Sequence, residues 1–298
     1  MKILLTGAHG QLGQHLAWRR PAGIDWFATA RNHPDHPCDL ADWSQLDALL
    51  EAVQPDIIIN AAAWTAVDAA ETHVDLAFRL NRDLPARLAN WCYHHQARLI
   101  TFSTDYVFSG SPERPWREDD PVLPESVYGQ SKLAGERAVA ESGASSIVLR
   151  TAWVYSHLPG NFLTAILGRA GKGQALRVVA DQVGSPTWAG DLAAAVWALI
   201  ERRNSWSDGP ALLHAAGASP MSWHEFAGLA VTCAVKKGLI DTAVEIAPIA
   251  SSEWPQQAAR PAWSVLDSTR LEKLLGQPML TADKALEACL EQWQQTQF

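Results

Sequence analysis

The chain has 298 residues, of which 48% belong to the hydrophobic set and 19% are charged. This length accommodates one large domain or two smaller ones with cores of their own, and the apolar fraction excludes a disordered chain. No apolar run approaches the roughly 20 residues that cross a bilayer. The 24 basic and 32 acidic residues give a formal net charge of −8, so the chain lacks the basic surface expected of a protein that binds nucleic acid or an anionic membrane.

Four cysteines, Cys38, Cys92, Cys233 and Cys289, are scattered without any metal-type spacing. So few thiols in so long a chain argue against a disulfide scaffold and fit a reduced, cytoplasmic protein. The apolar run after Lys2 is too short for a secretory signal peptide. We therefore expect a cytoplasmic location.

The first half of the sequence alternates between runs of strand length and stretches of helix length. Strands are expected at Lys2–Thr6, Ile24–Ala30, Ile57–Asn60, Arg98–Ser103 and Ser146–Thr151. Helices are expected between them, at Gln11–Arg20, Asp42–Val53, Asp75–His95 and Val127–Ser142. The strands are continuous apolar runs, which is typical of a parallel sheet covered by helices on both faces. This pattern predicts an α/β fold, with a Rossmann-type doubly wound parallel sheet over residues 1–155.

The second half, residues 156–298, is less regular. Strands are expected at Leu176–Ala180 and Leu212–Ala216, and helices at Asp191–Arg203, Ser222–Lys237, Ser268–Leu275 and Thr281–Gln294. The segments around Pro248, Pro255 and Pro261 are expected as loops that close over a cleft. We expect a smaller C-terminal α/β region that mainly binds substrate, with the chain able to cross back into the first domain.

The first strand runs directly into a glycine loop with the spacing GxxGxxG, at Gly7, Gly10 and Gly13. Between a strand and a helix, such glycines permit a tight turn and a close approach of the backbone to a pyrophosphate, which the helix N-terminus also attracts. Glycines can also mark an ordinary turn, but the position between the first strand and first helix favours dinucleotide binding.

The end of the second strand bears on the choice of cofactor. A carboxylate there holds the ribose 2′-hydroxyl of NAD, whereas an arginine accommodates the 2′-phosphate of NADP. The strand ends at Ala30 and Arg31 with no acidic residue at its tip. The sequence therefore favours NADPH, with NADH as a possible alternative and an ordinary surface arginine as the alternative role for Arg31.

Tyr128 and Lys132 lie four residues apart on a predicted helix, so both side chains leave the same face. Free tyrosine has a pKa near 10. A nearby ammonium group stabilises the phenolate, and lowering the pKa of Tyr128 by roughly 2–3 units would bring it into the range of efficient general acid–base catalysis. A YxxxK pattern alone also fits an ordinary surface pair.

The segment from Ile100 to Phe108 strengthens the catalytic interpretation, because it ends an apolar strand in a cluster of hydroxyl groups. Ligands of open parallel sheets bind beyond the carboxyl ends of the strands. Thr104 is therefore expected to hydrogen-bond a carbonyl oxygen as it gains charge, while Tyr128 supplies the proton. Capping of the following turn is the alternative, more for Ser103 than for Thr104.

With these motifs the chain resembles the extended short-chain dehydrogenase/reductase superfamily and, within it, the dTDP-4-dehydrorhamnose reductases. The resemblance covers the chain almost end to end. It rests on six segments: Thr6–Gly13, Asn60–Asp68, Ser103–Phe108, Tyr128–Glu136, Leu149–Ser156 and Asp181–Thr187.

The resemblance implies reduction of the 4-keto group of dTDP-6-deoxy-L-lyxo-4-hexulose to dTDP-L-rhamnose, a sugar donor for polysaccharides. It implies that Tyr128 donates the proton, that Lys132 lowers the pKa of Tyr128 and holds the nicotinamide ribose, and that Thr104 polarises the ketone. The implied cofactor contacts are Gly10, Gln11, Leu12, Asp39, Leu40, Ala62, Ala63 and Thr65. The implied contacts to the sugar are Val67, Asp68, Asp105, Tyr106 and Trp153.

In the second half the resemblance places Asn161, Gln182, Thr187 and Arg260 near the nucleotide. A diphosphate in an acidic protein needs a local cation, and Arg260 is the candidate, with a surface arginine as the alternative. No metal site is expected. Some members of the family are linked as dimers through magnesium held by glutamates. The positions aligned with those glutamates carry His15, Gly190 and Gln292, so a homodimer is possible but not through that metal.

Two competing functions stay open. One is another nucleotide-sugar epimerase, dehydratase or reductase on the same scaffold, although Thr104 is followed by Asp105 and Tyr106 rather than by the acidic pair of dehydratases. The other is a non-catalytic partner protein, because the regulatory subunit of methionine adenosyltransferase resembles the same family.

Overall fold

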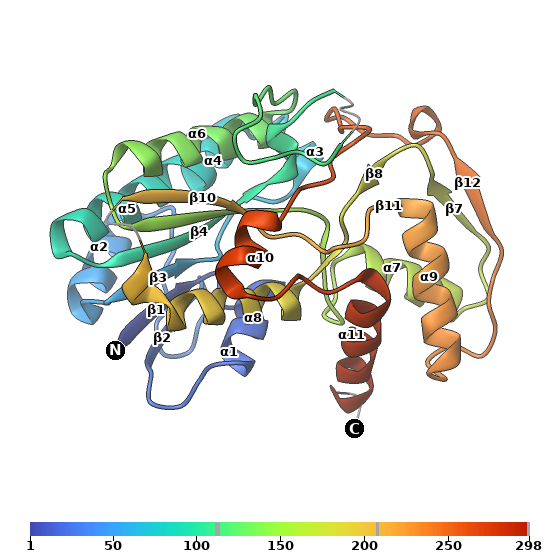
Figure 1. Cartoon of the computed structure of the whole chain (residues 1–298), viewed down its shortest axis with the longest axis horizontal. Helices are drawn as coiled ribbons and strands as arrows, with labels where there is room; N and C mark the ends of the chain where they lie inside the picture. The colour runs from blue at the N-terminus through green and yellow to red at the C-terminus, as the bar shows by residue number, and fades with distance from the viewer. Residues whose placement is uncertain (111–113, 207–208, 297–298) are drawn as a thin grey trace.

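The computed structural model describes residues 1–110, 114–206 and 209–296. Its main sheet has six parallel strands in the order β10-β5-β4-β3-β1-β2 (Figure 1). They are β1 (Lys2–Thr6), β2 (Asp25–Thr29), β3 (Ile57–Asn60), β4 (Arg98–Thr104), β5 (Ser146–Thr151) and β10 (Pro210–His214). The order reverses between β1 and β3, which confirms the doubly wound Rossmann-type sheet.

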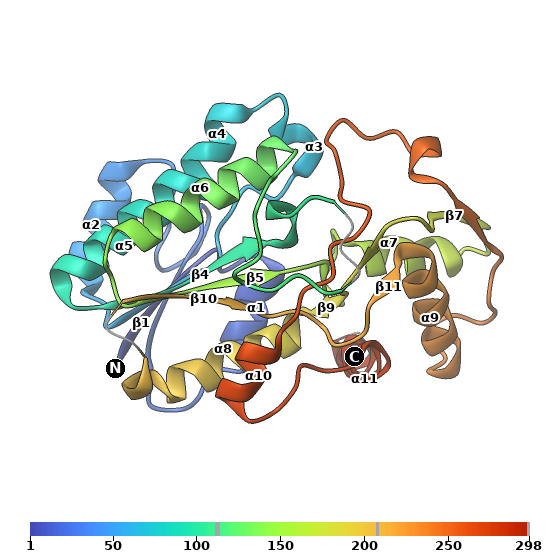
Figure 2. The ribbon, with the colours of Figure 1, turned by 45° about the horizontal axis from the view of Figure 1, so that its top comes forward.

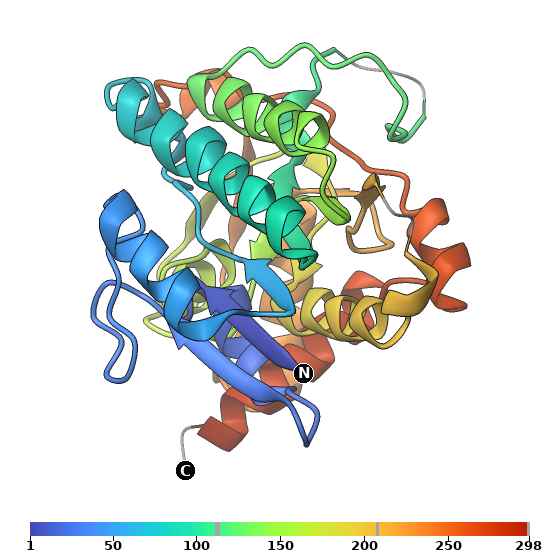
Figure 3. The same cartoon turned by 90° about the vertical axis from the view of Figure 1, so that its left-hand side faces the viewer.

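Two layers of helices cover the sheet because its strands are apolar on both faces. Ile57 and Ile59 belong to the core beneath α1 (Gln11–Trp18), α8 (Ala189–Glu201) and α10 (Thr269–Leu275). Ile58, between them, belongs to the core beneath α2 (Trp43–Val53), α5 (Leu84–His95) and α6 (Val127–Glu141). Figure 2 shows the two groups of helices on opposite sides of the strands, and Figure 3 shows the same layers from the end of the sheet.

The expected helix Asp75–His95 is divided in the structure. It consists of α4 (Val74–Phe78), a π-helical turn (Arg79–Asp83) and α5. Inside the π turn the Asn81 side chain is buried, and its amide group hydrogen-bonds the Trp64 backbone and the Ser131 hydroxyl. The turn therefore holds the loop after β3 against α6.

A second region packs beside the carboxyl ends of the main sheet. Its core is formed by α7 (Phe162–Ala170), α9 (Trp223–Lys236), α11 (Ala282–Thr296) and the paired strands β7 (Leu176–Val179) and β12 (Ile246–Ile249). The expectation of a loop around Pro248 is wrong, because Pro248 lies within β12.

The smaller elements are α3 (Val67–Ala70), β6 (Val154–Tyr155), β8 (Val183–Gly184), β9 (Thr187–Trp188), β11 (Met221–Ser222) and 3-10 turns at Asp105–Val107, Arg203–Ser205 and Ser251–Glu253. No helix in the described ranges is long and apolar enough to cross a membrane.

The chain returns from the second region to the first through α8 and then β10, which forms one edge of the main sheet beside β5. Helices α8 and α10 also lie against that sheet (Figure 1). Residues after 155 thus complete the Rossmann sheet as well as building the second region.

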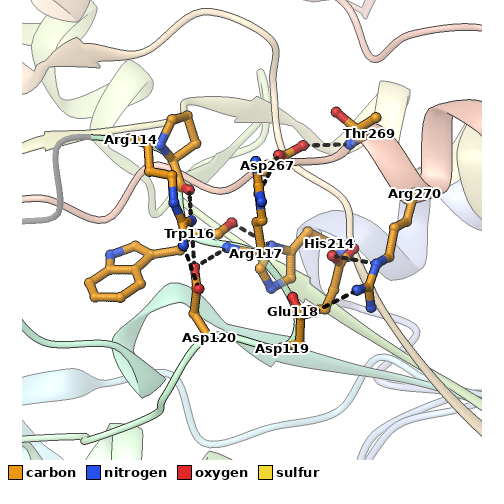
Figure 4. Close-up of polar contacts among 11 residues, drawn as sticks. Arg114, Trp116, Arg117, Glu118, Asp119, Asp120, His214, Asp267, Thr269 and Arg270 are labelled. Carbon is orange, nitrogen blue, oxygen red and sulfur yellow. Dashed lines mark hydrogen bonds and ion pairs between the residues drawn. The ribbon is translucent and has the colours of Figure 1, made fainter.

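A polar network fixes the segment 114–120 to this returning chain (Figure 4). The buried Glu118 carboxylate accepts the backbone N–H of His214 at 3.0 Å and lies 3.4 Å from the Arg270 guanidinium. Asp120 accepts both the Arg114 side chain and the backbone N–H of Arg117. These contacts set the path of the chain that leads from β4 to α6.

Candidate active site

A cavity of about 590 Å³ opens at the carboxyl ends of the strands, around the point where the strand order reverses. This size and position are typical of ligand sites in open α/β sheets. Most of the residues expected from the sequence line it: Gly7, Gly10, Gln11, Leu12, Ala30, Arg31, Asp39, Leu40, Ala62, Ala63, Thr65, Val67, Thr104, Asp105, Tyr106, Tyr128, Lys132 and Trp153.

The glycine loop forms one end of the cavity. Gly7 has a φ of +75°, and a Cβ at this residue would lie 2.7 Å from the backbone of Ala61 and Ala62. A Cβ on Gly13 would lie 2.2 Å from the Gly7 carbonyl oxygen, so Gly13 serves close packing of α1 and does not line the cavity. Helix α1 begins after Gly10 without a side-chain cap. Its first N–H groups are therefore free for an anion such as the pyrophosphate of a dinucleotide.

Arg31 lies at the tip of β2, at the same end of the cavity. Its Nε is 3.5 Å from the Asp39 carboxylate, and its side chain is 73% exposed. Such an exposed pair is weak, so the guanidinium is free to contact a ribose phosphate. Asp39 is the nearby carboxylate that a ribose hydroxyl requires, and this end of the cavity therefore fits either nicotinamide dinucleotide.

Tyr128, Lys132 and Thr104 converge at the other end of the cavity. Helix α6 begins there because the Ser126 hydroxyl accepts the Gly129 N–H and the Glu71 carboxylate accepts the Val127 N–H. Gly129 admits the Tyr106 carbonyl oxygen, which a Cβ would meet at 2.3 Å. These contacts place the first turn of α6, and with it Tyr128, against the end of β4.

The Tyr128 phenol lies beside the Thr104 hydroxyl in this cavity. Lys132 Nζ donates to the Phe102 carbonyl oxygen at 2.6 Å. The phenol, the alcohol and the ammonium group therefore line one cavity, as the sequence predicts.

The electrostatics of this triad differ from expectation. Burial raises the pKa of Tyr128 to about 12, the Thr104 hydroxyl opposes this rise, and Asp105 adds to it. Burial lowers the pKa of Lys132 to about 8, with Glu136 acting in the opposite direction. The expectation that Lys132 lowers the pKa of Tyr128 is thus not met in the free chain. Tyr128 remains a protonated phenol, which is the form that a proton donor to a ketone requires.

Trp153 lies in the wall of the cavity with a positive φ of 47°. Its indole ring stacks on Trp223 with a centroid distance of 3.5 Å and an interplanar angle of 4°. One face of Trp153 is therefore covered by a residue to which the sequence assigned only a helix start. Trp223 and Tyr106 also line a second cavity of about 270 Å³, so the two aromatic residues stand between the cavities.

The second cavity contains two of the residues expected near the nucleotide, Gln182 and Arg260. The Arg260 guanidinium donates to both carboxylate oxygens of Asp68, at 3.1 and 2.7 Å. Asp68 also accepts the backbone N–H groups of Gln257 and Ala258. The residues expected to contact sugar and diphosphate are thus paired with each other, and Asp68 does not line either cavity.

Asn161 and Thr187 do not line either cavity. The Asn161 side chain caps α7 and donates to the carbonyl oxygens of Ser156 and Leu158. The buried Thr187 hydroxyl donates to the Ser185 carbonyl oxygen and accepts the Gly217 N–H. Their polar groups are therefore occupied within the fold.

The positions aligned with magnesium-binding glutamates do not fit a shared metal site. The ring of His15 is fully buried and packs against Trp18, His157 and Trp188. Gly190 has no side chain, and a Cβ there would lie 2.4 Å from the Trp188 ring. The set of donors lacks the carboxylates that magnesium prefers.

The parallel sheet, the glycine loop and the tyrosine–lysine pair in one cavity define a dinucleotide-dependent oxidoreductase of the short-chain dehydrogenase/reductase class. The family model described as "RmlD substrate binding domain" matches residues 1–295. The chain belongs to this family, that of the dTDP-4-dehydrorhamnose reductases.

Individual relatives agree with this assignment. A dTDP-4-dehydrorhamnose reductase of Burkholderia thailandensis is 38% identical over 93% of each chain. The spore coat polysaccharide biosynthesis protein SpsK of Bacillus subtilis is 36% identical over 91% of each chain. A crystal structure of dTDP-4-dehydrorhamnose reductase from Bacillus anthracis in complex with NADP superposes with a TM-score of 0.87 at 31% identity, covering 98% of this chain and 99% of that one.

Proposed function

We propose that this protein uses NADPH to reduce the 4-keto group of dTDP-6-deoxy-L-lyxo-4-hexulose, giving dTDP-L-rhamnose for polysaccharide biosynthesis. The observation that carries the proposal is the convergence of Tyr128, Thr104 and Lys132 on a cavity that ends at the glycine loop. Relatives that cover almost the whole chain are named as enzymes of this reaction, and one solved relative holds NADP.

Residues at different positions along the cavity have different roles in the proposed reaction. The glycine loop and the free N–H groups of α1 bind the pyrophosphate, and Arg31 favours a 2′-phosphate. The bound dinucleotide supplies a hydride. Tyr128 donates its phenol proton to the ketone oxygen, which becomes a far stronger base than a phenolate once the carbonyl is reduced. The Phe102 carbonyl oxygen holds the Lys132 ammonium group in the same cavity, where it is placed to bind the nicotinamide ribose.

The proposal is tested with purified protein, the dTDP-linked 4-keto-6-deoxy sugar and NADPH, following the loss of the near-ultraviolet absorbance of the reduced nicotinamide. We expect stoichiometric formation of dTDP-L-rhamnose, with NADH accepted less well. Absence of turnover with both nicotinamides would reject the reductase assignment and favour a non-catalytic partner protein. Release of water or an altered sugar configuration without net oxidation of NADPH would indicate a dehydratase or epimerase.

We also propose a cytoplasmic location, which the unpaired state of Cys38, Cys92, Cys233 and Cys289 supports. A homodimer is proposed only without a magnesium link. Sedimentation with and without a chelator tests this, because a metal-linked dimer dissociates when magnesium is removed.

A further inference from the structure

The Asp105 carboxylate lies directly behind the Thr104 hydroxyl. Asp105 is 2% exposed, and its Oδ1 accepts the Thr104 O–H at 3.0 Å. Its Oδ2 is also buried and, within the part of the chain that the structure describes, accepts no well-aligned hydrogen bond, although the Ser264 hydroxyl lies near the carboxylate. A buried carboxylate with one oxygen unpartnered is costly, which points to a role beyond folding.

The hydrogen bonds around Thr104 leave no proton for the ketone. A threonine hydroxyl has one proton and two lone pairs. The proton is donated to Asp105, while the oxygen accepts the Tyr106 backbone N–H at 3.2 Å. With its proton on Asp105, Thr104 can only accept from the neighbouring Tyr128 phenol. Turning the Thr104 proton toward Tyr128 instead stabilises a phenolate, and this is the direction in which the Thr104 hydroxyl shifts the pKa of Tyr128.

We propose that Asp105 is a positioning residue that, through its protonation, sets whether Thr104 accepts from Tyr128 or donates to it. This inference rests on the proposed reduction and concerns the same site. With Asp105 protonated, its O–H donates to Thr104, and the Thr104 O–H turns to Tyr128. The alcohol then stabilises the phenolate that forms when Tyr128 gives up its proton.

The reaction balances without any further reactant. The ketone carbon receives the hydride of the reduced nicotinamide, the phenol O–H bond of Tyr128 breaks, and a new O–H bond forms on the ketone oxygen. The protons of Thr104 and Asp105 are redirected to new acceptors but stay on their own oxygens. A carboxylate at Asp105 opposes the step, because its charge also disfavours a phenolate at Tyr128.

The surroundings place this change in an accessible pH range. Burial raises the pKa of Asp105 to about 6, with the Ser264 and Thr104 hydroxyls favouring the charged form. The ionisable groups that face it are Tyr106 on its own turn and Tyr128 on α6. Arg260, whose charge lowers the pKa of Tyr106, is already paired with Asp68.

The experiment measures the single-turnover rate of hydride transfer from about pH 5 to about pH 9 with saturating NADPH and keto sugar. The wild-type rate is expected to rise about tenfold as the pH falls through about 6, the change that one hydrogen bond to a charged oxygen produces. Asp105→Asn, whose amide imitates the protonated acid, is expected to lose this rise. Thr104→Val is expected to lose it too, whereas Thr104→Ser keeps it.

Thr104→Val combined with Asp105→Asn tests whether Asp105 acts through Thr104, since linked residues give non-additive effects. The double variant is expected to have the pH profile of Thr104→Val alone. A rise retained in Asp105→Asn or in Thr104→Val, or a changed KM for the sugar without a changed profile, would overturn the proposal. If Asp105→Asn does not fold, as judged by thermal unfolding, the Thr104→Val and Thr104→Ser pair decides. Failure of the wild-type protein to reduce the sugar would count against the proposed function instead.

Discussion

Asp68 and Arg260 form a two-point ion pair across 192 positions of sequence. The pair joins α3 to the segment 251–262, which crosses beside the second cavity. Asp181 holds the other end of this segment by accepting the N–H and hydroxyl of Ser251. The hydrogen bonds from Arg260 hold the pKa of Asp68 at about 2, so this attachment persists until the solution is strongly acidic.

Asp68→Ala is expected to release the segment near Arg260 without unfolding the protein. Amide hydrogen exchange at Gln257 and Ala258 should accelerate at least about tenfold, because both N–H groups lose their acceptor. Asp181→Ala is the matched control and should accelerate exchange at Ser251 alone. Unchanged exchange at 257–258 would show that other contacts hold the segment.

Tyr128→Phe is expected to reduce turnover by about 10²–10⁴-fold, because the ring remains while the donated proton is lost. Binding of NADPH, measured by quenching of tryptophan fluorescence, should change little, since Tyr128 lies away from the glycine loop. A variant that retains more than a tenth of the wild-type rate would mean that another group protonates the ketone.

Arg31→Ala is expected to raise the KM for NADPH about tenfold and to leave that for NADH nearly unchanged, because only NADPH carries the 2′-phosphate. Asp39→Asn is the opposite control: it removes the negative charge beside Arg31 and should favour NADPH further. Equal effects of Arg31→Ala on both cofactors would indicate that Arg31 is an ordinary surface arginine that does not contact the 2′-phosphate.

Glu136→Gln is expected to destabilise the fold by about 3–5 kcal/mol, the cost of breaking a buried ion pair. Glu136 and Arg150 share hydrogen bonds of 2.8 and 2.7 Å, and both side chains are less than a tenth exposed. Urea unfolding measures the loss. The double replacement Glu136→Leu with Arg150→Met should cost less than Glu136→Gln, since it leaves no unpaired charge.

His15 is expected to make the protein less stable in mild acid. Its pKa is lowered to about 3, chiefly by burial and then by His157 and Arg19, whereas an unfolded histidine titrates near 6.5. Between about pH 6.5 and pH 3 the unfolded chain therefore binds a proton that the folded chain does not. This residue should therefore lower the free energy of unfolding by about 1.4 kcal/mol for each unit by which the pH is decreased within that range. His15→Phe should reduce that slope, and parallel curves would contradict the assignment.

The bounds of helices and strands are predicted best from the sequence where a single interaction, such as complete burial, determines the local structure. Fully buried strands require continuous apolar runs, so Ile57–Asn60 and Ser146–Thr151 were predicted with their observed bounds. The helix α7 was missed although its signals are local: Asn161 and Thr164 form a capping box before an apolar stripe. Strand β12 was missed because Pro248 argues against a strand, yet as part of a two-stranded sheet it is tolerated.

The sequence predicts most of the residues that line the site, but it does not predict which of them contact one another. Strand ends and helix spacing bring Thr104, Tyr128 and Lys132 together, and these follow from short-range patterns. The stack of Trp153 on Trp223 and the pairing of Asp68 with Arg260 join distant segments. No periodicity in one chain specifies which distant side chains meet, so these contacts required the structure.

The return of β10 to the edge of the main sheet bears on how the protein is made on the ribosome. Strand β5 has no outer neighbour until residue 214 has left the exit tunnel, and α10 arrives later still. The nascent chain must therefore keep an apolar sheet edge shielded while about sixty further residues are synthesised. Premature termination of translation within that interval would therefore yield a truncated chain that is prone to aggregation and not a functional half of the enzyme.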